Sequence, residues 1–255
     1  MILWLISLSC LGHHRGGPSY DRCPVYPGSA LLLDEVRMDG MLISVYETTQ
    51  GDWSNRTASN PTPVSAGCGE TKPVMGVDLD SAFNFANTVS SAYNLPHYYR
   101  KGRKGWTVDV DSSGFRYPTG DEWWRFTFAY SVPDMADSAN ICDFGNVSDQ
   151  SRLSEGGVDS LYRRYDGDVR SLYAPCSDGV SGLAEVGSFT PTSSLVADSV
   201  GNADELIVEV VDGMPTPYTI GGAYWSRGDW SSVTSPKAFS ASANRAGLRL
   251  IRRSD

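Results

Sequence analysis

The chain has 255 residues, with 21 Lys or Arg against 30 Asp or Glu, so its formal net charge is −9. This acidic balance argues against a nucleic-acid-binding surface, which needs clustered cations to release the counterions of phosphates. No stretch reaches the roughly 20 apolar residues that a membrane-spanning helix requires. A chain of this length can bury a sizeable core without a metal ion, and its 26 Gly and 14 Pro indicate many turns.

The first residues resemble an export signal. Met1 to Leu11 form a short apolar run that ends in the small residues Ser9 and Cys10. The run is similar to a signal peptide with a lipoprotein cleavage site, at which Cys10 would become the lipidated first residue. The alternative is a buried first strand of a cytoplasmic protein, since no Lys or Arg precedes the run. We predict export to the cell envelope as a bacterial lipoprotein, with residues 1–29 as leader and tether and residues 30–255 as one domain.

The five cysteines are compatible with this location. If Cys10 carries a lipid, four cysteines remain, namely Cys23, Cys68, Cys142 and Cys176. An even number permits two disulfides in an oxidising compartment, and three pairings are possible. We favour the pairing of Cys142 with Cys176 and of Cys23 with Cys68. None of the cysteines forms a Cys-x-x-Cys pair and the chain has only three histidines, so a zinc site of the usual kind is not expected.

The first half of the domain holds the clearest periodic patterns. Residues 31–47 read as strands, with Met41, Ile43 and Val45 on one face. Residues 81–93 form the best helix pattern, and Asp80 is placed to cap its start.

A second helix is predicted over residues 119–130, because Thr119 and Glu122 have the spacing of a capping box. The following 90 residues show poor periodicity, apart from a strand pattern at 206–211, and the end of the chain alternates like a strand over 246–252. Two main helices, short strands and many irregular loops indicate an α+β fold with its function in the loops.

Short motifs follow one another in a characteristic order. They are ISVYETT (43–49), DW (52–53), PVMGVD (73–78), GFRYPT (114–119), VGSF (186–189), GN (201–202), GGAYW (221–225) and GLRL (247–250). This series resembles the formylglycine-generating enzyme family, also called sulfatase-modifying factors, over residues 33–252. The resemblance implies an elaborated C-type-lectin-like fold, which agrees with the α+β pattern.

The resemblance also implies two structural calcium sites in the loops. The ligands of the first would be the side chains of Asp198 and Glu205 and the carbonyls of Gly201 and Ala203. The ligands of the second would be the side chains of Asn140 and Asp178 and the carbonyls of Ile141 and Val180. Calcium prefers six to eight hard oxygens of these kinds. The alternative is that these are ordinary turn residues, since Asp, Asn and Gly favour turns.

The catalytic positions of the family are altered. Its oxidative members use two cysteines shortly after the Gly-Gly step, and the matching positions here are Ser226 and Ser231. A hydroxyl is a poor ligand for Cu(I) and cannot exchange with disulfides. We therefore expect neither copper nor formylglycine-generating activity. A related branch uses three histidine-type iron ligands, which His97 alone cannot supply.

The remaining candidate is a binding surface over residues 221–235, hereafter the 221–235 surface. It carries Trp225, Arg227, Asp229 and Trp230, which are residue types that often anchor interfaces. We predict a non-catalytic module that binds a protein or small ligand there, with membrane anchoring through a lipid on Cys10. One alternative is an enzyme of the same fold with a divergent active site. Another is a diversified binding protein of a diversity-generating retroelement, varied over 221–249.

Overall fold

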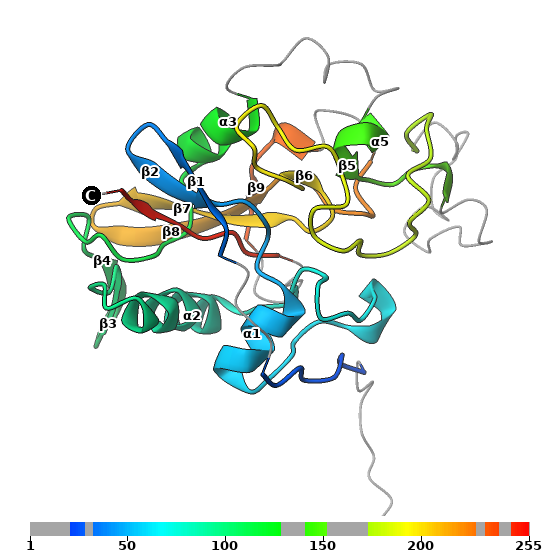
Figure 1. Ribbon diagram of the computed structural model, residues 1–255. Helices are drawn as coiled ribbons and strands as arrows, with labels where there is room; N and C mark the ends of the chain where they lie inside the picture. The colour runs from blue at the N-terminus through cyan, green and yellow to red at the C-terminus, as the bar shows by residue number, and fades with distance from the viewer. Residues whose placement is uncertain are drawn as a thin grey trace, which may run out of the picture.

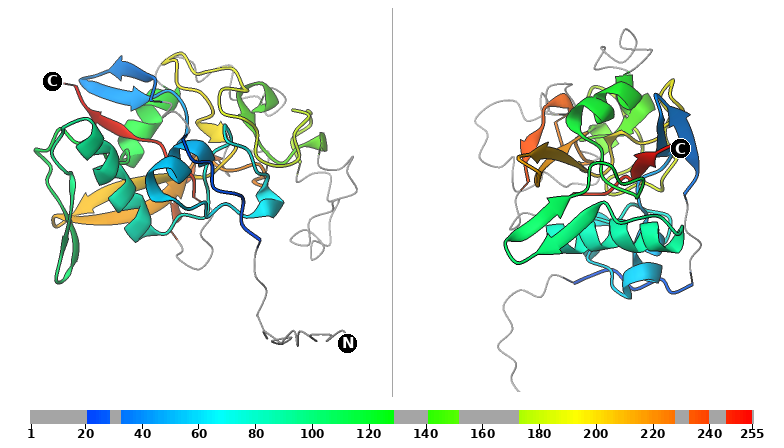
Figure 2. Two further views of the ribbon diagram at one scale, coloured as in Figure 1. Left: turned by 60° about the horizontal axis from the view of Figure 1, so that its bottom comes forward. Right: turned by 90° about the vertical axis from the view of Figure 1, so that its left-hand side faces the viewer.

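The computed structural model describes residues 21–28, 33–128, 141–151, 173–227, 233–239 and 246–254. These residues form four α-helices and several small sheets, joined by irregular loops. In Figure 1, α1 and α2 lie on one side of the central strands and α3 lies on the other, and Figure 2 shows the same layering from the end. The helices are α1 (Gln50–Thr57), α2 (Leu79–Ala92), α3 (Gly120–Phe128), α5 (Ile141–Phe144) and the 3-10 helix η1 (Val64–Ala66). The α+β prediction is confirmed.

The strands form four small sheets. They are β1 (Glu35–Met38), β2 (Met41–Ser44), β3 (Tyr99–Gly102), β4 (Gly105–Val108), β5 (Gly145–Asn146), β6 (Val200–Gly201), β7 (Glu205–Val211), β8 (Met214–Ile220), β9 (Lys237–Ala238) and β10 (Ile251–Arg253). The sheet orders are β1-β2-β10, β3-β4, β5-β6 and β7-β8-β9, and only β5-β6 is parallel. Among the described residues, no helix is long and apolar enough to cross a membrane.

The two ends of the domain meet at β2, where Ile43 lies opposite Val36 of β1 and Ile251 of β10. The predicted strand over 246–252 is regular only at its end. Its earlier residues bond to several different segments instead of one ladder, since Leu248 accepts from the Thr48 N–H and Gly247 donates to the Asp204 carbonyl. This tail therefore connects the 44–48 segment with the loop that precedes β7.

Helix α2 has the predicted apolar stripe, and Phe83, on that stripe, is fully buried. Its start differs from the prediction. The cap is Asp78, whose carboxylate accepts from the Ser81 N–H at 2.9 Å. Asp80 binds Lys101 Nζ and Trp106 Nε1 at 2.6 Å each. Asp80 is thus inside the first turn and fastens the β3–β4 hairpin to α2.

Capping boxes start α1 and α3. In α3 the predicted box is present, because the Thr119 N–H donates to Glu122 Oε2 at 2.9 Å and the Glu122 N–H donates to Thr119 Oγ1 at 3.3 Å. In α1 the box joins Thr49 to Asp52. The sequence did not predict α1, since Trp53 is its only large apolar residue and no stripe is visible.

Residues 21–28 were assigned to the tether, but they are attached to the domain. Cys23 forms a disulfide with Cys68, and its N–H donates to the Thr62 carbonyl at 2.8 Å. Asn60 Nδ2 donates to the Pro24 carbonyl at 2.8 Å. Residues 21–28 therefore belong to the folded domain and not to the tether. The sequence offered no sign of this, because the segment has no periodicity.

The second disulfide joins Cys142 in α5 to Cys176. The structure thus contains both pairs that the sequence analysis favoured. This bond fastens the short helix to the irregular segment over 173–180, which has little regular structure of its own.

Candidate functional site

The segment after β8 is a tight turn that presents two aromatic rings. Gly221 and Gly222 have φ angles of +96° and +75°, and a Cβ on Gly222 would lie 2.7 Å from Val233 Cγ1. Glycine alone suits such a position. Tyr224 and Trp225 follow, with ring centroids 4.6 Å apart and nearly perpendicular planes. Both rings are half-buried against a small apolar cluster, so each keeps part of its surface exposed to solvent.

Ser226, at the position of the first family cysteine, is buried in this turn. Its Oγ accepts from the Ala223 N–H at 2.9 Å, and its own N–H donates to the Ala223 carbonyl at 2.6 Å. Its carbonyl accepts from the Ser148 N–H at 2.9 Å. The hydroxyl therefore stabilises the turn. Ser231 lies outside the described residues.

Of the four predicted contact residues, the structure describes two. Arg227 is exposed directly after the turn and forms a parallel β-bridge with Ser148, while Trp225 is half-buried beside it. Asp229 and Trp230 lie outside the described residues, as does Cys10. The described part of the 221–235 surface is thus held to the segment after β5 on one side and to the core on the other.

The loop of the first predicted calcium site lies directly beneath this turn. The Gly201 N–H donates to the Gly221 carbonyl at 2.7 Å, and the Tyr224 N–H donates to the Asn202 carbonyl at 3.1 Å. The carbonyl of Ala203, another predicted ligand, belongs to a fully buried residue in the same loop. A change in this loop would therefore be transmitted to the aromatic turn.

A buried arginine engages one of the predicted calcium ligands. Arg249 donates to Glu205 Oε1 through Nε at 2.8 Å and through Nη2 at 2.5 Å. Its other N–H groups donate to the backbone carbonyls of Ser44, Val45 and Ala197. The second oxygen of Glu205 accepts from Trp123 Nε1 at 3.0 Å. Both oxygens of Glu205 are therefore in use.

Asp198, the other acid of that site, has one oxygen to spare. Its Oδ2 accepts from the Gly187 N–H, while Oδ1 is buried and has no partner among the described residues. Burial raises the pKa of Asp198 to about 6. Asp198 and Glu205 as arranged do not fit calcium as a pair, because Glu205 already binds Arg249 and Trp123. Calcium at this site stays a prediction. Its binding would require Glu205 to release Arg249 or Trp123.

A third acid, Glu47, belongs to the same buried group and was missed in the sequence analysis. Its carboxylate accepts from Asn202 Nδ2 at 2.8 Å and from the Ala203 N–H at 3.2 Å. Burial raises the pKa of Glu47 well above its usual value, and the charges of Asp198 and Glu205 raise it further. Three carboxyls thus lie near the guanidinium of Arg249, whose charge only partly offsets the rise in the pKa of Glu47.

The second predicted calcium site retains unpartnered oxygen. Asp178 Oδ1 accepts from the Val180 N–H at 2.7 Å, whereas Oδ2 is buried without a partner among the described residues. Asp149, which the sequence analysis did not name, accepts from the Asp178 N–H. Burial raises the pKa of Asp178 to about 7, and the nearby Asp149 carboxylate adds to the effect. Ile141 begins α5, and Asn140 lies outside the described residues.

These two carboxylates fit a hard cation better than the first site does, because neither is bound to a cationic side chain of the described residues. Within the described ranges, no group of three or more His, Cys, Asp and Glu side chains is arranged to hold a metal ion. Calcium here would depend on backbone carbonyls and on Asn140 in addition.

The missed residues gave a sequence signal that can be named. Glu47 and Arg249 are single charges within the apolar motifs ISVYETT and GLRL. A charge in such a setting is buried only when it is paired. Glu47 binds Asn202 and Ala203, and Arg249 binds Glu205, so each charge has partners far from it along the chain. The pattern could therefore show that each charge needs a partner but not which one.

No protein-family profile and no curated protein sequence matches the chain. Three solved structures are similar to it. CarF has a TM-score of 0.54 and 21% identity, over 92% of this chain and 97% of that chain. Treponema denticola variable protein 1 has a TM-score of 0.56 and 17% identity, over 89% and 94%. PvdO from Pseudomonas aeruginosa has a TM-score of 0.58 and 16% identity, over 84% and 80%.

At these identities the likeness concerns the fold. It extends over most of each chain, and it agrees with the order of motifs and with the layered arrangement of small sheets and helices. The chain therefore has a formylglycine-generating-enzyme-like, C-type-lectin-like fold.

Proposed function

We propose that the chain is an exported binding protein without the oxidative chemistry of the formylglycine-generating enzymes, and that the 221–235 surface contacts its ligand. The observation that carries the proposal is Ser226. It stands where the resemblance places the first catalytic cysteine, and its hydroxyl is taken up by the Ala223 N–H inside a buried turn. A hydroxyl ligates Cu(I) poorly and does not take part in thiol–disulfide exchange.

The turn itself supports a binding role. Two adjacent aromatic rings and an exposed arginine project from a backbone that is hydrogen-bonded to Asn202 and Ser148. Aromatic and arginine side chains supply most of the energy in many interfaces. A rigid turn lowers the entropy that must be lost on binding. The ligand is a protein or a small molecule with apolar surface for Trp225 and an acceptor for Arg227.

Export is part of the same proposal. The two disulfides support it, because such bonds persist in oxidising compartments. Cell fractionation tests it. The chain is expected in the membrane fraction of the producing bacterium, and Cys10→Ser is expected to release it. A Cys10→Ser variant that stays with the membrane would contradict the lipid anchor.

The absence of oxidative chemistry can be tested directly. The chain is incubated with Cu(I), oxygen and a cysteine-containing sulfatase peptide, and the peptide is examined by mass spectrometry. An active formylglycine-generating enzyme under the same conditions serves as the positive control. We expect the cysteine to remain unmodified. Conversion to formylglycine would overturn the proposal.

The location of the binding surface is tested with ligands selected from a random-peptide display library. We expect Trp225→Ala and Arg227→Ala to weaken the selected peptides by about 30-fold each, the loss typical of an interface anchor. Arg103→Ala, an exposed change in the β3–β4 hairpin, is the matched control and should have no effect. Selected peptides that bind all three variants equally would place the binding surface elsewhere.

Diversification is a second candidate, and one specific observation favours it. One of the similar structures is named a variable protein. If this chain is diversified, sibling sequences should differ at exposed positions such as Arg227. They should retain Gly222 and Ser226, because the turn depends on them. A search of the neighbouring DNA for a reverse transcriptase and a near-repeat template would decide the matter, and finding neither would refute this candidate.

A further inference from the structure

A hollow of about 430 Å³ lies between the β1–β2 turn, α3 and β10, and we call it the arginine pocket. In Figures 1 and 2, the β1–β2 hairpin and the C-terminus lie at one end of the molecule, and α5, β5 and β6 lie toward the other. The aromatic turn is hydrogen-bonded to β6, so the arginine pocket is remote from the 221–235 surface. The residues that matter for its chemistry are Asp39, Tyr98, Arg116, Glu122, Arg125 and Arg253.

One arginine of the pocket is fixed by the fold. Arg116 donates to both oxygens of Glu122, at 2.7 Å and 2.6 Å, and its guanidinium lies 5.5 Å from the centroid of the Tyr98 ring. This pair is mostly shielded from solvent, with side-chain exposures of 12% and 19%. Arg116 and Glu122 therefore form a rigid, nearly neutral wall.

The other two arginines have no such partner in the part of the chain that the structure describes. No described residue forms a hydrogen bond or ion pair with Arg125 of α3 or Arg253 of β10. Their neighbour Arg252 differs, because it binds both oxygens of Glu35 at 2.9 Å and 2.8 Å. Where this region uses an arginine for structure, a carboxylate accompanies it. Two exposed guanidiniums without an ion-pair partner among the described residues thus line one hollow, in a chain with a net charge of −9.

Tyr98 adds a neutral donor. Its ring is mostly buried, its hydroxyl donates to no described residue, and the side chain lines the pocket. Burial raises the pKa of Tyr98, so the phenol keeps its proton at neutral pH. A protonated phenol can donate to an anion without adding charge of its own.

We propose that the arginine pocket binds a small oxyanion, a phosphate or a carboxylate group, with Arg125 and Arg253 as the charged donors and Tyr98 as the neutral donor. Guanidinium groups match the geometry of both anions and form charge-assisted hydrogen bonds with them. Asp39, which also lines the pocket, opposes the anion. It limits the site to ligands with a small negative charge or with a cationic group beside the anionic one.

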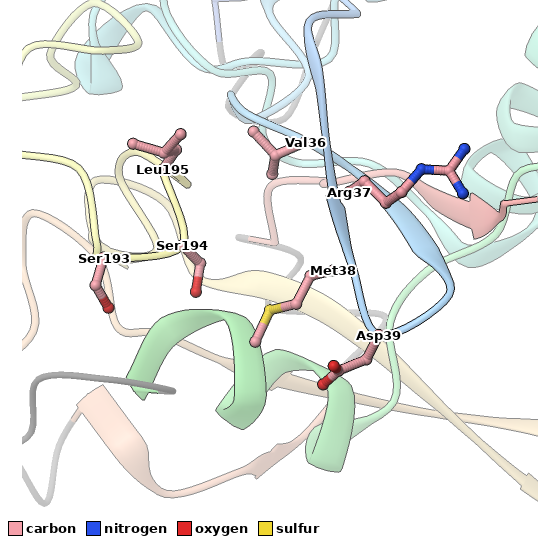
Figure 3. A pocket seen from close by; sticks show the side chains of 7 residues that line it. All are labelled: Val36, Arg37, Met38, Asp39, Ser193, Ser194 and Leu195. Carbon is pink, nitrogen blue, oxygen red and sulfur yellow. The ribbon is translucent and has the colours of Figure 1, made fainter.

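A neighbouring hollow of about 450 Å³ shows the contrast. Figure 3 shows Val36 and Met38 on one side of β1, facing the segment with Leu195, while the guanidinium of Arg37 is directed away. Its other side chains are those of Ser193, Ser194 and Asp39, so it gathers no group of cations. The arginine pocket therefore differs in charge from the hollow beside it.

Titration calorimetry at low ionic strength tests the proposal, with inorganic phosphate and succinate as separate probes. We expect at least one of them to bind, and Arg125→Gln and Arg253→Gln each to weaken it by about tenfold or more. Asp39→Asn should strengthen binding, because it removes the opposing charge. Arg103→Gln changes the net charge equally at an exposed site outside the pocket and should leave the affinity unchanged.

Two results would overturn the proposal. One is no binding of either probe at about 10 mM, where a functional anion site should be occupied. The other is an equal loss in Arg103→Gln and Arg125→Gln, which would indicate a general effect of charge. Thermal melts of each variant confirm folding. The Trp225→Ala variant should bind the probes like the wild type, so this test does not depend on the 221–235 surface.

Discussion

The buried pair of Arg249 and Glu205 ties the C-terminal segment to β7. Replacing Arg249 with Leu would leave the Glu205 carboxylate buried without its cation, beside the carboxyls of Glu47 and Asp198. We expect Arg249→Leu to lower the free energy of unfolding by about 3–5 kcal/mol, measured by urea denaturation. Arg100→Leu breaks the pair with Asp109, whose side chains are 65% and 32% exposed, and should cost less than about 1 kcal/mol. Equal losses would mean that Arg249 does not compensate the buried acids.

For individual residues, the sequence predicted positions but not contacts, and this pair is an example. The positions of Asp198, Glu205 and Ser226 followed from the resemblance, and the structure brings their loops together. The contact of Glu205 with Arg249 did not follow, because 44 residues separate them and no local pattern links them. The commitment of the Ser226 hydroxyl to the turn also depends on backbone geometry, which residue types do not specify.

The start of α3 couples helix capping to an ion pair, and this coupling predicts a dependence on pH. Burial alone would raise the pKa of Glu122, but its bonds to Arg116 and Thr119 lower it overall. Because folding lowers this pKa, the stabilisation is present above the unfolded-state pKa and is lost as the pH falls through the folded-state value. Glu122→Gln should therefore cost about 1–2 kcal/mol at neutral pH. The difference from the wild type should shrink toward zero as the pH falls below the lowered pKa of Glu122.

Urea denaturation of both proteins across this pH range checks the prediction. Asp212→Asn is the control, since Asp212 is exposed at the β7–β8 turn with a φ angle of +52°, which Asn tolerates. It should show little effect at any pH. A Glu122→Gln difference that is the same at acid and neutral pH would exclude the ion pair as its cause.

Elements with local signals were the predictable ones. The capping box of α3 lies within four residues, and the stripe of α2 repeats over several turns, so both were visible in the sequence. The cap of α2 was placed two residues late, because Asp78 and Asp80 are equally suitable by residue type and only the backbone angles distinguish them. Residues 246–250 alternate like a strand, yet they bond to several segments, which is a tertiary choice that periodicity does not report.

The attachment of residues 21–28 to the domain can be tested by truncation. A chain without residues 1–20 retains Cys23 and should be as stable as the full chain. A chain without residues 1–29 loses the disulfide to Cys68, which spans 45 positions, and the contacts of Pro24. We expect this second chain to lose roughly 2–4 kcal/mol in urea denaturation and to expose one free thiol per molecule. If both chains were equally stable, residues 21–28 would be a tether in solution.

Calcium binding would stabilise the whole molecule. A ligand that binds only the folded state raises the free energy of unfolding, and the rise grows with the logarithm of the ligand concentration over the dissociation constant. We expect calcium to raise the melting temperature relative to EGTA. Asp178→Asn should abolish the rise, since Asp178 has a buried oxygen without a described partner. Asp198→Asn should retain the rise, because the companion acid Glu205 already binds Arg249 and Trp123. A rise lost in Asp198→Asn and kept in Asp178→Asn would show instead that the Glu205 contacts open to admit the ion. No rise in the wild type would mean that these acids are turn residues and that the two disulfides and the Arg249 pair hold the loops without a metal.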